Sequence, residues 1–185
     1  MRNRETARLG AEWLPQARGD VLEVGIGSGL NLPFYSSQVR RVYGLDPSAE
    51  LQRMARARMT ATPFEVEFFV QSAEDPVPLF DASVDTIVLT WTLCSIANAP
   101  TALQQIRRVL KTDGHLIFLE HGRAPDPAVA AWQSRLTPVW KRLAGGCHLD
   151  RKIDDIIEAA GFQIIELRTC YLPGRCYRGS PSSRS

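Results

Sequence analysis

Glycine occupies alternate positions directly after a short apolar run in the stretch LEVGIGSGLNLPFY (residues 22–35). Gly25, Gly27 and Gly29 give the spacing GxGxG, whereas the dinucleotide-binding fingerprint needs its third glycine where this chain has Leu30. Glycine permits positive φ angles and lets ligand atoms touch the backbone, and an open α/β sheet binds its cofactor at the turn after the first strand. The spacing therefore favours S-adenosylmethionine, which has no pyrophosphate, over NAD.

Apolar runs of strand length alternate with helical segments along the chain. The expected strands are residues 21–25, 41–46, 66–70, 85–90, 115–120 and 163–172. Apolar residues at helical spacing mark residues 48–59, with Ser48 as the N-cap, and residues 101–110. Apolar strands joined by helices imply a parallel sheet covered on both faces. The expected fold is an α/β, Rossmann-like three-layer sandwich with a mostly parallel sheet.

The alternation stops after Glu120. We expect one helix near residues 128–136 and a second short helix that begins at Thr137-Pro138. A last helix is expected over residues 150–160, closed by Gly161. A chain of 185 residues has the size of one domain. The domain is expected to span residues 1–173 with a helical acceptor-pocket insert at about 122–149, followed by a disordered polar tail, residues 174–185.

Composition narrows the classes of function. Basic and acidic residues are mixed along the chain and leave a formal net charge of +2, so nothing demands a nucleic-acid partner. The four cysteines lack the paired short spacings of a zinc site and are interpreted as thiols in a reducing compartment, with no metal bound. No apolar stretch approaches the ~20 residues that span a bilayer, and the N-terminus is not a signal peptide. We expect a cytoplasmic protein without stable membrane insertion.

Two carboxylates accompany the glycine turn. Asp46 lies 21 residues beyond Gly25 at the end of the second strand, where it can accept hydrogen bonds from both ribose hydroxyls of a cofactor. Capping of the helix that follows Pro47 is an alternative compatible with that role. Glu23 lies inside the first strand, where an unpaired charge would be costly to bury. Its partner is either the amides of the glycine turn or the amino group of the ligand.

Further polar residues follow the next strands. Ser72, Ala73 and Glu74 come after the third strand, which places them beside the adenine, and a surface loop is the alternative. Thr90 ends the fourth strand next to the expected sulfonium. The segment TWTLCSI (residues 90–96) is therefore expected to form the floor of the active site.

These segments together resemble the class I methyltransferases: VLEVGIGSGLNLPFY, VYGLDPS, SAED, DTIVLTWTLCSI, RRVLKTDGHLIFLEHG and GCHLDRKIDDIIEAAGF. Over about residues 20 to 170 they are most similar to the methyltransferase-like 7 family of alkyl thiol methyltransferases and its bacterial relatives. The resemblance implies the class I methyltransferase fold, S-adenosylmethionine as cofactor and a thiol acceptor. Asn31 and Pro47 fall within the quoted segments and join the expected cofactor site.

Two departures from the family pattern stand out. Thr112-Asp113-Gly114 replaces the usual proline-glycine-glycine turn before the fifth strand. The family closes its sheet with a seventh strand that ends in an aromatic-rich, glycine-containing segment, and the tail of this chain offers only CYRGS. We therefore expect the final strand to be truncated or displaced. A second copy of the chain, in a homodimer, is one candidate cover for the edge that this would expose.

Glu120 and His121 follow the fifth strand and are the candidate catalytic bases. His121 can accept a proton near neutral pH, and a thiol needs only slight help to become a thiolate. The alternative is that one of the two hydrogen-bonds a loop or orients the methionyl group. Cys147-His148 is interpreted as local packing or part of a lid. Arg151 is expected to pair with an acidic substrate or with a carboxylate on its own helix.

The insert carries four large apolar residues at helical spacing: Trp132, Leu136, Trp140 and Leu143. This pattern fits a buried core and an apolar acceptor pocket equally well. Contact with a membrane interface is a third interpretation. The leading hypothesis is methyl transfer to a small lipophilic thiol by in-line displacement. N- or O-methylation of a lipid, quinone precursor or other metabolite is the second, and a cofactor-binding module with little turnover is the third. Nucleic-acid methylation is disfavoured because the fourth strand ends in TWTLCS, without the motif that holds a flipped base.

Overall fold

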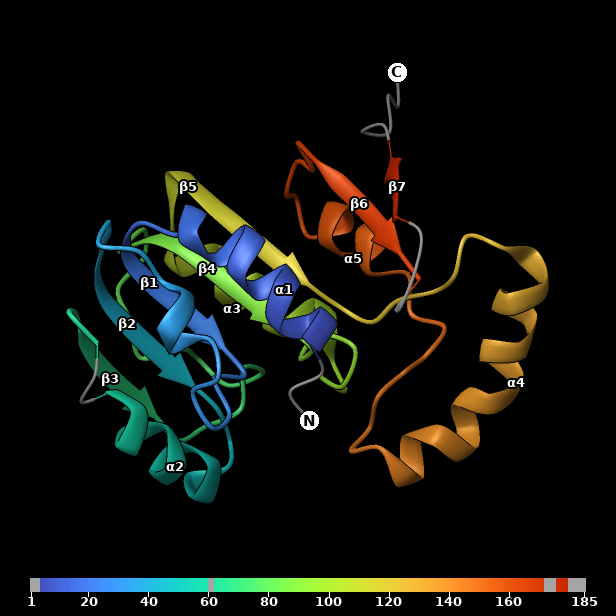
Figure 1. Cartoon of the computed structure of the whole chain (residues 1–185), viewed down its shortest axis with the longest axis horizontal. Helices are drawn as coiled ribbons and strands as arrows, with labels where there is room; N and C mark the ends of the chain where they lie inside the picture. The colour runs from blue at the N-terminus through green and yellow to red at the C-terminus, as the bar shows by residue number, and fades with distance from the viewer. Residues whose placement is uncertain (1–3, 60–61, 172–175, 180–185) are drawn as a thin grey trace.

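The structure is a computed structural model that describes residues 4–59, 62–171 and 176–179. Its centre is a five-stranded sheet in the order β3-β2-β1-β4-β5, in which all neighbouring strands are parallel (Figure 1). The strands are β1 Gly19–Val24, β2 Val39–Leu45, β3 Glu65–Phe69, β4 Val84–Thr90 and β5 Leu110–Leu119. The five strands expected in the sheet are thus confirmed, with boundaries that differ by up to five residues.

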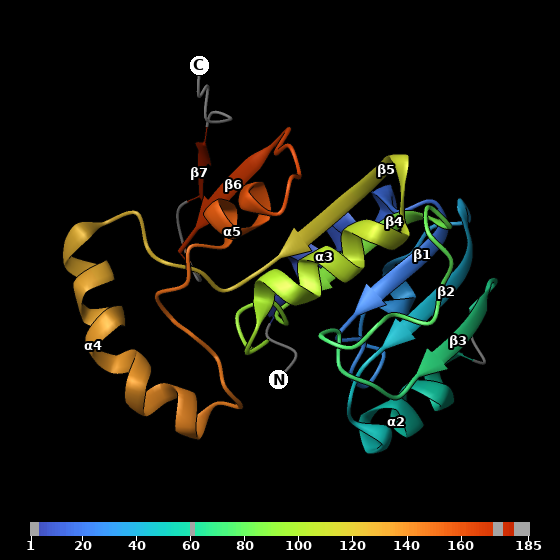
Figure 2. The same cartoon turned by 180° about the vertical axis from the view of Figure 1, so that it is seen from behind.

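Helices lie on both faces of this sheet (Figures 1 and 2). The helices of the chain are α1 Arg4–Trp13, α2 Ala49–Met59, α3 Ala99–Val109, α4 Pro127–Leu143 and α5 Ile153–Ala159, of which α4 lies to one side of the sheet. One apolar cluster joins the sheet to α3 and α5, and a second joins its other face to the short turn of helix at Leu14–Gln16 that follows α1. These two clusters confirm the predicted three-layer arrangement.

Local capping explains where the helices after β2 and β4 begin. The Ser48 hydroxyl accepts the amide hydrogen of Leu51 at 3.2 Å, as predicted for an N-cap. The Asn98 side chain accepts the amide hydrogen of Thr101 at 3.2 Å, and proline lies in the first turn of α3.

Helix α1 was not among the elements expected from the sequence. Trp13 at the end of α1 packs against the Arg168 guanidinium, whose carbon lies 5.0 Å from the centroid of the Trp13 ring.

The carboxyl-terminal strands lie outside the main sheet. β6 (Leu167–Cys170) pairs antiparallel with β7 (Cys176–Gly179) in a separate two-stranded sheet. Among the described residues, β5 therefore pairs only with β4 and ends the main sheet. The expected strand at 163–172 is shorter and displaced, and part of the tail expected to be disordered forms β7 instead. The rest of that tail lies outside the described residues.

Helix α4 differs most from expectation. The prediction of two helices divided at Thr137-Pro138 is wrong, because α4 runs unbroken over 17 residues with Pro138 inside it. Figure 1 shows α4 to one side of the sheet, joined to it by extended segments. Within the described residues, no helix is long and apolar enough to cross a membrane.

The cysteines also require a correction. Cys94 and Cys147 are free, but Cys170 takes part in a disulfide bond. The prediction that all four cysteines are thiols is therefore wrong. Disulfides persist mainly in oxidising compartments, so cysteine usage no longer supports the predicted reducing compartment.

Candidate functional site

The glycine turn leaves the end of β1 with the backbone expected for ligand approach. Gly25, Gly27 and Gly29 have φ angles of 76°, 50° and 74°, a region that other residues rarely adopt. The turn is held because the amides of Gly25 and Ile26 both donate to the Leu45 carbonyl, at 2.7 and 3.2 Å. A Cβ at position 25 would overlap the Thr92 side chain, whereas one at position 27 would meet no atom closer than 3.9 Å. Free space therefore lies beside Gly27.

Glu23 is completely buried at the centre of the sheet and is paired on both oxygens. Its Oε1 accepts from Asn31 Nδ2 at 2.8 Å, and its Oε2 accepts from the Tyr35 hydroxyl at 2.9 Å. Asn31 Nδ2 also donates to Thr90 Oγ1 at 2.8 Å, which joins β1, the LNLPFY segment and β4 in one network. Burial raises the pKa of Glu23 to about 7. Sequence reasoning named neither Asn31 nor Tyr35 as its partner.

Asp46 links the glycine turn to the start of α2. Its Oδ2 accepts from the Gly27 amide at 3.0 Å, and its Oδ1 accepts from the Ser48 amide at 2.8 Å. Asp46 thus holds the turn that precedes α2, and Pro47 lies within that turn. The N-cap of the helix is Ser48 instead of Asp46. A carboxylate has about four lone-pair sites, so the ribose role of Asp46 stays a prediction compatible with these contacts.

The segment after β3 is tied to the start of α3. Ser72 Oγ accepts from the Glu74 amide at 3.2 Å, and Glu74 Oε1 accepts from the Asn98 amide at 3.3 Å. Ala73 between them is buried in the apolar cluster, and Ser72 and Glu74 are half-buried. These contacts fix the loop to the start of α3, and contact with adenine stays a prediction.

Glu120 holds the loop after β4. Its Oε1 accepts from the amides of Thr92 and Leu93, both at 2.8 Å, and its Oε2 accepts from the Cys94 amide at 3.2 Å. Burial raises the pKa of Glu120, and these hydrogen bonds oppose the rise. The contacts support the loop-holding alternative for Glu120 over a role as base. For the neighbouring His121, desolvation lowers the pKa of the imidazole.

The end of the insert is fastened to the same loop. Arg151 Nη1 donates to the carbonyls of Leu93 at 2.6 Å and Ile96 at 2.7 Å. The observed partners of Arg151 are therefore backbone carbonyls distant in sequence instead of Asp154 or Asp155 on its own helix, and pairing with an acidic substrate stays a prediction. The His148 amide donates to the Cys94 carbonyl at 2.9 Å, and the Cys147 and Cys94 sulfurs are 3.6 Å apart. These contacts support local packing for Cys147-His148, and the described residues hold no candidate metal cluster.

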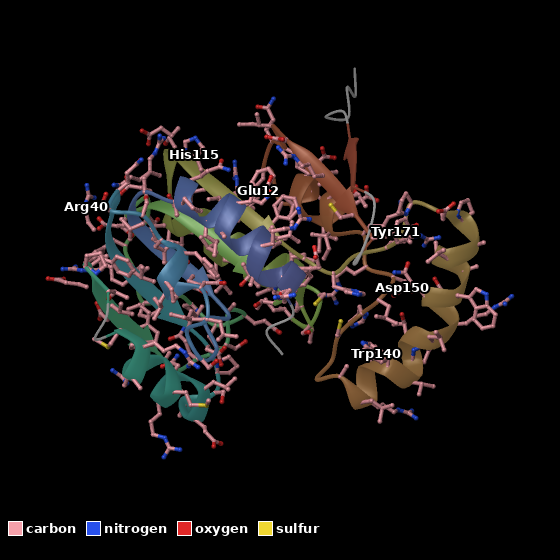
Figure 3. All side chains as sticks on the ribbon, in the orientation of Figure 1. Glu12, Arg40, His115, Trp140, Asp150 and Tyr171 are labelled. Carbon is pink, nitrogen blue, oxygen red and sulfur yellow. The ribbon has the colours of Figure 1, made fainter. Side chains whose placement is uncertain are left out.

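The stem of the insert closes at one place. The Arg123 amide donates to the Arg151 carbonyl at 2.9 Å, so the two ends of the segment meet. The Gln133 side chain donates to the Gly122 carbonyl at 3.1 Å and accepts from the Ala124 amide at 2.7 Å, which fixes the start of α4. Further along, Thr137 Oγ1 donates to Asp150 Oδ1 at 3.1 Å; Figure 3 labels Asp150 and Trp140 in this part of the molecule.

The apolar residues of the insert are exposed. The exposed fractions are 61% for Trp132, 51% for Leu136, 44% for Trp140 and 78% for Leu143. The core interpretation is therefore wrong for these residues, and none of them lines a groove that runs along β5. That groove, of about 1540 Å³, follows the free edge of β5 between α1 and β6. Its lining includes Glu120 and His121 at the carboxyl end of β5.

Comparisons with known proteins agree with this arrangement. A family model described as "Methyltransferase domain" matches residues 22–118. The chain is 36% identical over 151 residues to the thiol S-methyltransferase TMT1B of Rattus norvegicus, which covers 80% of this chain and 61% of the relative. The chain thus spans less than two thirds of that relative's length.

Solved structures show the same fold at lower identity. The YcgJ protein of Bacillus subtilis has a TM-score of 0.71 and 20% identity, covering 90% of this chain and 73% of its own. A structure named a putative methyltransferase from Bacillus halodurans has a TM-score of 0.70 and 22% identity, covering 87% and 70%. The expected α/β fold class is therefore confirmed.

Proposed function

This chain belongs to the methyltransferase domain family, and we propose that it transfers the methyl group of S-adenosylmethionine to a small lipophilic thiol. The observation that carries the proposal is the meeting of the glycine turn, Asp46 and Thr90 at the carboxyl ends of three adjacent strands, β1, β2 and β4. Parallel α/β sheets bind ligands at that edge. The thiol acceptor is supported by the likeness to a relative named thiol S-methyltransferase.

The residues present fit the adenosyl cofactor. Space that a Cβ would fill is free beside Gly27, and the nearest side-chain atom there is Asp46 Oδ2 at 4.0 Å. We assign the ribose to the remaining lone pairs of Asp46, the adenine to Ser72, Ala73 and Glu74, and the amino-acid end to the Glu23–Asn31 network. When bound, S-adenosylmethionine supplies a methyl group on a positively charged sulfur.

Reaction requires that the protein hold the acceptor in line and exclude water. The loop at residues 92–94, fixed by the three hydrogen bonds to Glu120, provides a rigid wall for that purpose. A cysteine-like thiol has a pKa of ~8.5, so a neutral imidazole near the site is a sufficient proton acceptor at pH 7. We assign that acceptor to His121 and the positioning of the loop to Glu120.

Asp46→Ala tests the cofactor assignment. Loss of the carboxylate leaves ribose hydroxyls without an acceptor, so calorimetry should show binding of S-adenosylhomocysteine weakened by roughly 1–3 kcal/mol. Asp46→Asn is the matched control, because it keeps an acceptor oxygen and should lose less. Equal affinity in the wild type and in Asp46→Ala would mean that the ribose is held elsewhere.

The acceptor is tested by supplying a short alkyl thiol, a phenol and an amine side by side with S-adenosylmethionine. We expect methylated thiol as the main product, with His121→Gln lowering kcat and removing the rise of rate that accompanies deprotonation of an imidazolium. Product from the phenol or amine alone would replace the thiol with another acceptor. Tight cofactor binding with no product from any acceptor would instead indicate a binding module.

A further inference from the structure

Helix α4 presents a continuous apolar stripe to solvent. Six large apolar side chains are exposed along it, with exposed fractions from 40% to 78%: Val129, Trp132, Leu136, Val139, Trp140 and Leu143. At 3.6 residues per turn, these positions fall within a sector of about 100°. The residues that α4 buries, Ala130 and Thr137, lie beside this sector and face the rest of the protein. A stripe of this size on a folded surface marks an interaction site.

The charges on α4 have one sign. Arg135, Lys141 and Arg142 are all exposed, and no acidic residue lies between Pro127 and Leu143. At about 100° per residue, Arg135 and Arg142 lie along one border of the apolar sector, and Lys141 lies beyond the other. The Arg135 guanidinium lies 5.7 Å from the centroid of the Trp132 ring, so a cation and an aromatic ring share that border.

We propose that the exposed face of α4 binds the surface of an anionic phospholipid bilayer. An apolar stripe that contains tryptophan and is bordered by cations is the pattern of a helix lying in the plane of a membrane interface. The apolar side chains enter the acyl boundary, Arg135 and Arg142 pair with anionic headgroups, and the exposed Lys141 adds to the positive charge of the helix. This proposal concerns a surface outside the cofactor site and does not rest on the proposed methyl transfer.

A second copy of the chain is the competing occupant, and the charge on α4 argues against it. Pairing two α4 faces would bring the cations of both copies together, and α4 has no acidic residue to answer them. A bilayer with anionic headgroups supplies the missing opposite charge along the border that carries Arg135 and Arg142. The membrane is therefore the occupant that fits both the apolar and the charged part of the helix.

Vesicle sedimentation with the full chain tests the proposal. Vesicles of phosphatidylcholine mixed with phosphatidylglycerol should carry the protein down, and phosphatidylcholine alone should bind it at least ~10-fold more weakly. Added salt should reduce the binding to mixed vesicles. If the wild-type protein stays in the supernatant with both kinds of vesicle, the proposal is overturned.

Two variants separate the contributions of stripe and charge. Leu136→Ser/Val139→Ser/Leu143→Ser should abolish sedimentation with either kind of vesicle. Arg135→Gln/Lys141→Gln/Arg142→Gln should lose the preference for phosphatidylglycerol while keeping the weak binding to neutral vesicles. Thermal unfolding of each variant shows whether the fold is retained. We expect it to be retained, because the three apolar and three cationic side chains that are replaced are all exposed.

The matched control removes apolar side chains of equal exposure elsewhere. Phe80→Ser/Ile165→Ser changes residues that are 88% and 78% exposed but lie outside α4, and it should bind vesicles like the wild type. Equal loss in this control would mean nonspecific adsorption and would overturn the proposal. A dimer in sedimentation equilibrium that the serine variant dissociates, without binding of vesicles by the wild type, would assign the face to a second copy instead.

Discussion

Two regions of the molecule differ in how they treat polar and apolar side chains. One is the turn region, formed by the glycine turn with Glu23, Asp46 and Thr90. The other is the insert at residues 122–149. In the turn region even a fully buried carboxylate has partners on both oxygens, donated by Asn31 and Tyr35. In the insert, a helix of 17 residues exposes most of its large apolar side chains. The turn region is thus part of the core, whereas the large apolar side chains of the insert add little buried surface to the fold.

Replacing one glycine in each region gives the largest expected difference in unfolding free energy between them. Gly25→Ala places a Cβ into the Thr92 side chain at a positive φ, so we expect a loss of more than ~4 kcal/mol in unfolding free energy, or failure to fold. Gly145→Ala, at the end of the helix in the insert, has a φ of 58° and no atom within 4 Å of the added Cβ. It should lose only ~1 kcal/mol from backbone strain. Urea unfolding measures both; similar losses would contradict the contrast.

Glu23 gives the turn region a pH dependence of its own. Its pKa is about 7 in the folded protein against 4.5 as the ordinary value, so the folded state holds an extra proton between these pH values. Its contribution to stability is therefore complete below pH 4.5 and is lost as the pH rises through about 7, a change of about 3 kcal/mol. Glu23→Gln cannot titrate, so the difference in unfolding free energy between the two proteins should change with pH in that window. A constant difference from pH 3.5 to 8, about one pH unit beyond each limit, would refute this.

The smallest effect is expected on the insert. Leu143→Ser changes a side chain that is 78% exposed and should shift the unfolding free energy by no more than ~0.5 kcal/mol. Leu93→Ala, at a fully buried position in the loop held by Glu120, should lose ~2–5 kcal/mol. Thermal or urea unfolding compares them. Comparable losses would show that α4 packs against the domain more than its exposure indicates.

The fold followed from patterns that are local in sequence. Apolar runs and helical spacing located the five sheet strands, and Ser48 marked the start of α2. The positive φ angles at Gly25, Gly27 and Gly29 were likewise predictable, because glycine at those positions has a local conformational reason. The start of β5 was not predicted from the sequence, which indicated a strand from residue 115. In the structure β5 begins at Leu110, which pairs with Val84, and a register shift between Val84 and Thr86 separates this pair from the rest of the ladder.

Contacts between distant segments were not predictable in the same way. Arg151 donates to carbonyls of Leu93 and Ile96, more than fifty residues earlier, and a backbone carbonyl leaves no signature in the sequence. Tyr35 was visible within LNLPFY, yet only the folded turn brings its hydroxyl to Glu23. The exposure of α4 was missed because an apolar stripe at helical spacing looks the same whether a core or solvent lies beside it.

The hydrogen bond between the Arg123 amide and the Arg151 carbonyl has a consequence for changes in the insert. Because the intervening segment departs and returns at neighbouring points, its length and sequence can change while the spacing of the two anchoring points stays the same. Changes of length or sequence within this segment would then leave the parallel sheet and its anchoring points unaltered.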